Sequence, residues 1–153
     1  MIAGYSVLWS SYQRRVAATS DVFSALVLFL ELHDGRFPAS EEEFVRDSFE
    51  RKGPHSELVV RDPGHSLNVG KVYGTPFNDL KAFEIRYGTP LADLDGTGST
   101  VVSRQTGEDI LLIKLPEGEA ASRKYTKALF EVWTRIEQDN PKSVEPLNVR
   151  MEP

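Results

Sequence analysis

The chain has 153 residues, which suits a single domain with a sizeable hydrophobic core. Hydrophobic residues make up 40% and charged residues 27%, as in ordinary globular proteins, and the net charge of −5 argues against a nucleic-acid partner, which needs a basic surface. The absence of cysteine excludes disulfides, thiol catalysis and zinc–thiolate sites. No stretch reaches the roughly 18 consecutive apolar residues that indicate a membrane-spanning helix.

Apolar and aromatic residues recur in the first part of the chain at alternating spacings of four and three. The positions, which we call the N-terminal stripe, are Tyr5, Trp9, Tyr12, Val16, Thr19, Phe23, Leu26 and Leu30. This spacing predicts one long helix over residues 5–34, where no proline or glycine interrupts the chain. Its second half, VFSALVLFLEL (22–32), is apolar nearly all round, which predicts burial on more than one side.

The beginning of the N-terminal stripe leads to a prediction about partners. A sheet of short strands covers about 20 Å of a helix, enough for residues 16–32. Tyr5, Trp9 and Tyr12 then project beyond the domain on residues 1–15, and together with Val16 they form a candidate surface for a protein partner. The alternative is that the C-terminal helix or tail folds back over these side chains.

The segment ELHDGRFPASEEEF (31–44) predicts the end of this helix. Gly35 can adopt the left-handed conformation that closes a helix, and Pro38 blocks its continuation. His33 next to Asp34 has the composition of an oriented general base. A histidine in the last turn of a helix is also favourable by itself, because it complements the helix dipole. We therefore interpret this pair as structural.

The same segment predicts the start of a short second helix. Ser40 followed by Glu43 matches a capping box, in which the serine oxygen accepts from the Glu43 N–H and the glutamate side chain reaches back. We assign the apolar face of this helix to Phe44, Val45 and Phe49.

Short runs of β-forming residues, separated by turn residues, follow the second helix. They lie at 57–61, 69–73, 81–88, 99–105 and 109–115. None of these runs is followed by a helix and another strand, so we expect an antiparallel meander and not a parallel nucleotide-binding sheet. The strongest hairpin signal joins the last two runs, with Thr106 and Gly107 at its tip.

A helical pattern returns at Glu119 and ends before Pro141. Its apolar face comprises Tyr125, Leu129, Val132, Trp133 and Ile136. The predicted fold class is α+β, in which a long N-terminal helix packs on a small antiparallel sheet, with a short second helix and a C-terminal amphipathic helix. We expect one domain over residues 1–138 and an extended tail over residues 139–153.

Few residues are candidates for chemistry. His55, His65 and Asp62 contain metal-binding groups, but they lack a recognised metal-ligand spacing, so we interpret the histidines as solvated loop residues. No pattern nominates a nucleophile or a base, and we expect the protein not to be an enzyme.

The stretch ADLDGTGST (92–100) is the one candidate metal loop. Asp93 and Asp95 are oxygen ligands of the kind that Ca²⁺ prefers, although Arg104 stands where an EF-hand needs glutamate. The alternative is a plain turn that binds no ion, because Asp and Gly are good turn residues by themselves.

The order of these features resembles the soluble part of type IV pilin-like proteins, most closely the major pseudopilins of type II secretion. In that family a long N-terminal helix ends at a G-x-[YF]-P segment, here Gly35 to Pro38, and a D-P turn, here Asp62 and Pro63, precedes a short sheet. The resemblance covers roughly residues 16–90, and the C-terminal amphipathic helix departs from the family pattern.

The pilin-like resemblance implies a non-enzymatic structural or accessory subunit of a cell-envelope or membrane-associated assembly. Contact with a membrane requires an upstream anchor or a partner. It also implies a late acidic calcium loop, to which Asp93 and Asp95 correspond. The alternative function is a small ligand- or calcium-binding module.

Overall fold

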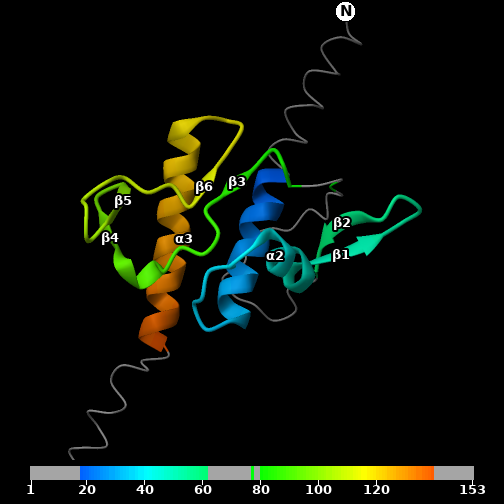
Figure 1. The fold of residues 1–153 in the computed structure, drawn as a ribbon, viewed down its shortest axis with the longest axis horizontal. Coiled ribbons are helices and arrows are strands. Elements are labelled where there is room, and N and C mark those ends of the chain that lie inside the picture. Colours follow the sequence, from blue (N-terminus) through cyan, green and yellow to red (C-terminus); the bar gives the residue numbers. More distant parts are fainter. Residues whose placement is uncertain (1–17, 62–76, 78–79, 140–153) are drawn as a thin grey trace, which may run out of the picture.

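The computed structural model describes residues 18–61, 77 and 80–139, and it confirms the α+β class (Figure 1). The first helix occupies residues 18–32. The elements that follow it are α2 (Glu41–Ser48), β1 (Phe49–Lys52), β2 (Glu57–Val60), β3 (Glu84–Ile85), the 3-10 helix η1 (Leu91–Asp93), β4 (Leu94–Thr97), β5 (Thr100–Ser103), β6 (Ile113–Lys114) and α3 (Glu119–Asp139).

The first helix is the centre of the core. In Figure 1 it lies between α3 on one side and the β1–β2 hairpin on the other. The ring of Phe23 contacts Tyr125 of α3 at a centroid distance of 5.2 Å, and Phe29 faces Phe44 of α2 at 6.3 Å. Residues 24–30 are all buried, which confirms the prediction of burial on more than one side. This is the arrangement that a helix apolar on all faces requires.

Two parts of the prediction for the first helix are not confirmed. Leu32, which we expected to be buried, is 60% exposed, because it ends the helix at the edge of the core. The predicted long helix before residue 18, with Tyr5, Trp9, Tyr12 and Val16, lies outside the described residues. The predicted tail lies outside them from residue 140 onward.

The described strands form three antiparallel pairs, not one meander. β1 pairs with β2, β4 with β5, and β3 with β6. Strand β1 begins at Phe49, which we had assigned to the second helix; that assignment is wrong because Phe49 has extended backbone angles and caps α2 from outside. The predicted strand at 69–73 lies outside the described residues.

The predicted hairpin around Thr106 and Gly107 forms its turn and one antiparallel bridge beside it, but no longer ladder. Gly107 N–H donates to Ser103 O, and the two arms share a single bridge between Val102 and Asp109. The ladder partner of β5 is β4, which lies within the candidate calcium loop 92–100. The hairpin stays short because the chain after Ile110 leaves β5 to pair with β3 and to dock on α3.

Buried hydroxyl groups of α3 hold this departing segment. Thr126 Oγ1 accepts from the N–H of Leu112 at 3.0 Å, and Ser122 Oγ accepts from the N–H of Leu115 at 2.8 Å. Each N–H would otherwise be buried without a partner, which is costly. Helix α3 therefore provides the acceptors for these N–H groups, which in a wider sheet would come from a neighbouring strand.

Candidate functional site

The first helix ends as its sequence predicts. Asp34 and Gly35 both adopt positive φ angles, 56° and 89°, and Gly35 N–H donates to Leu30 O at 2.7 Å. Such a bond satisfies a carbonyl that the helix end leaves open. Phe37 follows and is buried, so the chain turns inward toward the core at this point.

The predicted capping box of α2 is confirmed, with one modification. Glu43 N–H donates to Ser40 Oγ at 3.2 Å, but the Glu43 carboxylate accepts from the N–H of Ala39, one residue before the cap. The same carboxylate receives two hydrogen bonds from Arg36, at 3.0 and 2.7 Å. These bonds, the Arg36 contacts first, lower the pKa of Glu43 to about 2.

His33 pairs with Asp47 of α2 and not with its sequence neighbour Asp34. Its Nε2 lies 2.9 Å from Asp47 Oδ2, and its ring stacks on Phe29 at a centroid distance of 4.0 Å. Nδ1 lies 3.3 Å from Nη2 of Arg36, which is always a donor. The ring therefore donates from Nε2 to Asp47 and accepts at Nδ1. Both nitrogens are engaged, which favours the structural interpretation of His33 over an oriented base.

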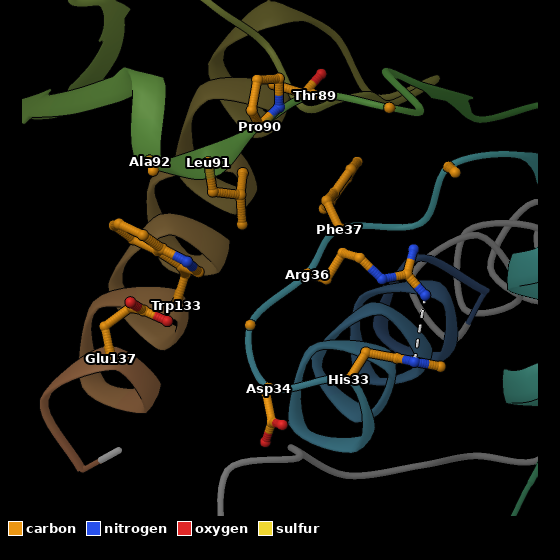
Figure 2. Close-up of a pocket in the computed structure, with 13 residues that line it drawn as sticks. His33, Asp34, Arg36, Phe37, Thr89, Pro90, Leu91, Ala92, Trp133 and Glu137 are labelled. Carbon is orange, nitrogen blue, oxygen red and sulfur yellow. Dashed lines mark hydrogen bonds between the residues drawn. The ribbon is translucent and has the colours of Figure 1, made fainter. Parts of the chain in front are cut away.

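A pocket of about 540 Å³ opens beside this helix end (Figure 2). Residues 33–37 and Ala39 form one wall, residues 88–92 form a second, and Trp133 and Glu137 of α3 form a third. Phe37 and Leu91 are almost completely buried and supply apolar lining. The pocket is thus built from three segments that are far apart in the sequence. It combines apolar and aromatic side chains with a few charged groups, which is the usual composition of a ligand site.

The third wall approaches the first closely at Gly35. A Cβ on Gly35 would lie 3.1 Å from Cδ1 of Trp133 and 3.2 Å from Oε2 of Glu137. Gly35 therefore serves two purposes: it takes the left-handed conformation, and it allows α3 to approach the helix end closely.

The two residues of the calcium prediction line different cavities. Asp93 ends η1 and lines a cavity of about 370 Å³, whereas Asp95 lies in β4 opposite Val102 and lines a different cavity of about 490 Å³. Within the described ranges, no three histidine or acidic side chains gather as a metal site. Calcium binding through Asp93 and Asp95 stays a prediction.

The other predicted site residues are placed only in part. Tyr5, Trp9, Tyr12 and Val16 lie outside the described residues, as do Asp62 and His65. His55 is exposed in the turn between β1 and β2. Sequence reasoning did not find Trp133 and Glu137 as pocket residues, because Trp133 belongs to the apolar face of a helix and the loop 88–92 carries no motif.

Comparisons of the chain with known protein families, with characterised proteins and with solved structures find no match. The resemblance to pilin-like proteins therefore stays a prediction. In the part of the chain that the structure describes, no helix has the length and apolar character needed to cross a membrane.

Proposed function

We propose that this protein is a non-enzymatic structural or accessory subunit of a larger assembly, which binds a protein partner through an N-terminal continuation of its first helix. The observation that supports the proposal is the burial of residues 24–30 on every side of that helix. A helix held in this way by α2 and α3 provides a firm base for an extension that carries a partner-binding surface.

The N-terminal stripe supports the same proposal. Its later positions Thr19, Leu26 and Leu30 are buried in the domain. Its earlier positions, Tyr5, Trp9, Tyr12 and Val16, continue the same spacing and are rich in the aromatic residues that dominate protein interfaces.

The described surface exposes few large apolar side chains to a partner. Leu32 is the one large hydrophobic side chain that is exposed among the described residues. The aromatic residues of the N-terminal stripe are therefore better candidates for the interface. The pilin-like resemblance supports an assembly in the cell envelope or at a membrane, reached through an upstream anchor or a partner.

The test uses the full chain with a double substitution in the stripe, Trp9→Ala with Tyr12→Ala. We expect loss of the high-mass species that light scattering detects after purification from the native cells, with the melting temperature of the domain unchanged. The matched control is Gln13→Ala with Arg14→Ala, which alters neighbouring residues off the stripe and should preserve the assembly. An assembly of unchanged mass in the stripe variant contradicts the proposal.

A small ligand-binding module is the second candidate function, and the 540 Å³ pocket favours it. Its calcium variant uses Asp93 and Asp95. Thermal melting with calcium and with a chelator tests this variant, since an ion that binds only the folded state raises the melting temperature. Identical midpoints under both conditions dismiss the calcium part.

A further inference from the structure

Most charged groups around the 540 Å³ pocket are balanced by neighbours. Arg36 pairs with Glu43 at 2.7 Å, and Arg46 lies 2.9 Å from Asp47. His33 uses both ring nitrogens on Asp47 and Arg36. Of these residues, His33 and Arg36 line the pocket, and both have partners. Asp34, the other charged residue of this wall, also takes part in an interaction, so the wall offers little charge to a ligand.

The wall formed by α3 carries one charged group, the carboxylate of Glu137, that is not paired in this way. Glu137 makes no ion pair or hydrogen bond with any residue of the described ranges, and the indole N–H of Trp133 has no acceptor there. The two side chains lie one helical turn apart and both approach Gly35, within 3.3 Å of the place of a Cβ. Figure 2 shows both side chains on α3, across the pocket from the segment 33–37, while the Asp34 carboxylate points away from Trp133.

Apolar surface adjoins this carboxylate. Trp133 is partly exposed, and Leu91 lies beside it on the second wall (Figure 2). A carboxylate next to an aromatic ring and an aliphatic side chain suits a cation that is carried on an apolar stem, because the stem packs on the hydrocarbon while the head forms a charge-assisted hydrogen bond. A cation near the ring gains further from the ring quadrupole.

We propose that this pocket binds an alkyl cation, a guanidinium or ammonium group on an aliphatic stem. The head pairs with the carboxylate of Glu137, and the stem packs between Trp133 and Leu91. The site lies in the folded domain, so it does not depend on the proposed role of the N-terminal stripe.

Trp133 supplies the signal for the test. The chain has two tryptophans, so Trp9→Phe in the full chain leaves Trp133 as the only indole. The indole N–H resonance is followed while N-acetyl-arginine amide is added. We expect a saturable shift with a Kd on the order of 1 mM, and at least roughly tenfold weaker binding of the neutral analogue N-acetyl-citrulline amide.

Substitutions on α3 assign the contact to one carboxylate. Glu137→Gln keeps the shape of the side chain and removes its charge, and we expect it to weaken arginine binding at least roughly tenfold. Glu131→Gln is the matched control, because it removes the same charge from the same helix outside this pocket and should leave the Kd unchanged. Far-ultraviolet circular dichroism confirms that both variants are folded.

Two probes distinguish the source of the cation, and either positive result supports the site. Agmatine binding as tightly as the blocked arginine points to a free small molecule. Tighter binding of a short arginine-containing peptide points to a basic side chain of a partner protein. The proposal is overturned by the absence of a saturable shift, by equal binding of the citrulline analogue, or by equal weakening in the Glu131→Gln variant.

Discussion

Nε2 of His33 lies 2.9 Å from Oδ2 of Asp47, and this contact fastens the end of the first helix to the last turn of α2. The His33 ring also stacks on Phe29, one turn earlier in the same helix. The pair thereby fixes the direction in which the chain leaves the first helix, and the segment that leaves is one wall of the 540 Å³ pocket.

A double-mutant cycle measures the contribution of this pair. His33→Phe keeps an aromatic ring against Phe29 but removes the N–H donor of the bond. Asp47→Asn keeps the shape of the acid but removes its charge. Since both side chains are mostly shielded from water, we expect a coupling free energy of about 1 kcal/mol from urea unfolding. Additive effects of the two substitutions would show that the pair contributes nothing.

The bonds that Glu43 accepts from Arg36 and Ala39 predict a loss of stability in acid. They lower the folded-state pKa of Glu43 to about 2, from an ordinary value of 4.5. Protons then bind the unfolded state more readily, so the contribution of Glu43 is complete above pH 4.5 and disappears as the pH falls toward about 2.

The prediction for Glu43 is tested by urea midpoints between about pH 6 and about pH 2. The difference between the wild-type protein and Glu43→Gln should shrink toward low pH. Glu42→Gln is the control for the loss of one carboxylate from the first turn of α2. A constant difference across the range would mean that Glu43 does not titrate as described.

Gly96 of β4 has no room for a side chain. A Cβ there would lie 2.7 Å from Nζ of Lys127 and 2.9 Å from Cε2 of Phe130 on α3. The lysine end can move, but Phe130 is buried against the core, so we expect Gly96→Ala to destabilise the domain by about 1–3 kcal/mol. The cost should fall in a Phe130→Leu background, where the ring is absent. Equal costs in both backgrounds would assign the effect to the backbone.

Thr126 of α3 accepts the buried N–H of Leu112, and its loss leaves that donor without a partner. We expect Thr126→Val to lower the free energy of unfolding by about 1–3 kcal/mol. Thr134→Val is the control, because the Thr134 hydroxyl bonds to the Phe130 carbonyl of its own helix and to no other residue of the described ranges. We expect its effect to be within about 0.5 kcal/mol. Similar losses in the two variants would contradict the supporting role of Thr126.

Local signals made several elements predictable. The left-handed Gly35, the Ser40 cap and the start of α3 at Glu119 are confirmed, because each depends on residues within about one helical turn. The burial of residues 24–30 was also predictable, since a helix without a polar face has no side to give to water.

Strand pairing was not predictable in the same way. The Thr106–Gly107 turn is a sound hairpin signal, yet only one bridge forms beside it. The ladder partner of β5 is β4, and β6 pairs with β3. Turn residues specify that the chain reverses its direction. Which strands then pair depends on which neighbouring segment also provides acceptors for the buried N–H groups. Here Ser122 and Thr126 of α3 accept the N–H groups of Leu115 and Leu112, so these residues can leave β5 without losing hydrogen bonds.

The sequence by itself determined the α+β class, the buried central helix and the stop and cap at residues 33–43, because periodicity, glycine conformation and capping act over a few neighbouring residues. Only the tertiary structure decided that His33 pairs with Asp47 and that Trp133 and Glu137 meet Gly35 in one pocket. Those contacts join residues that packing around the first helix brings together. No local sequence pattern specifies which distant side chain will contact the end of that helix.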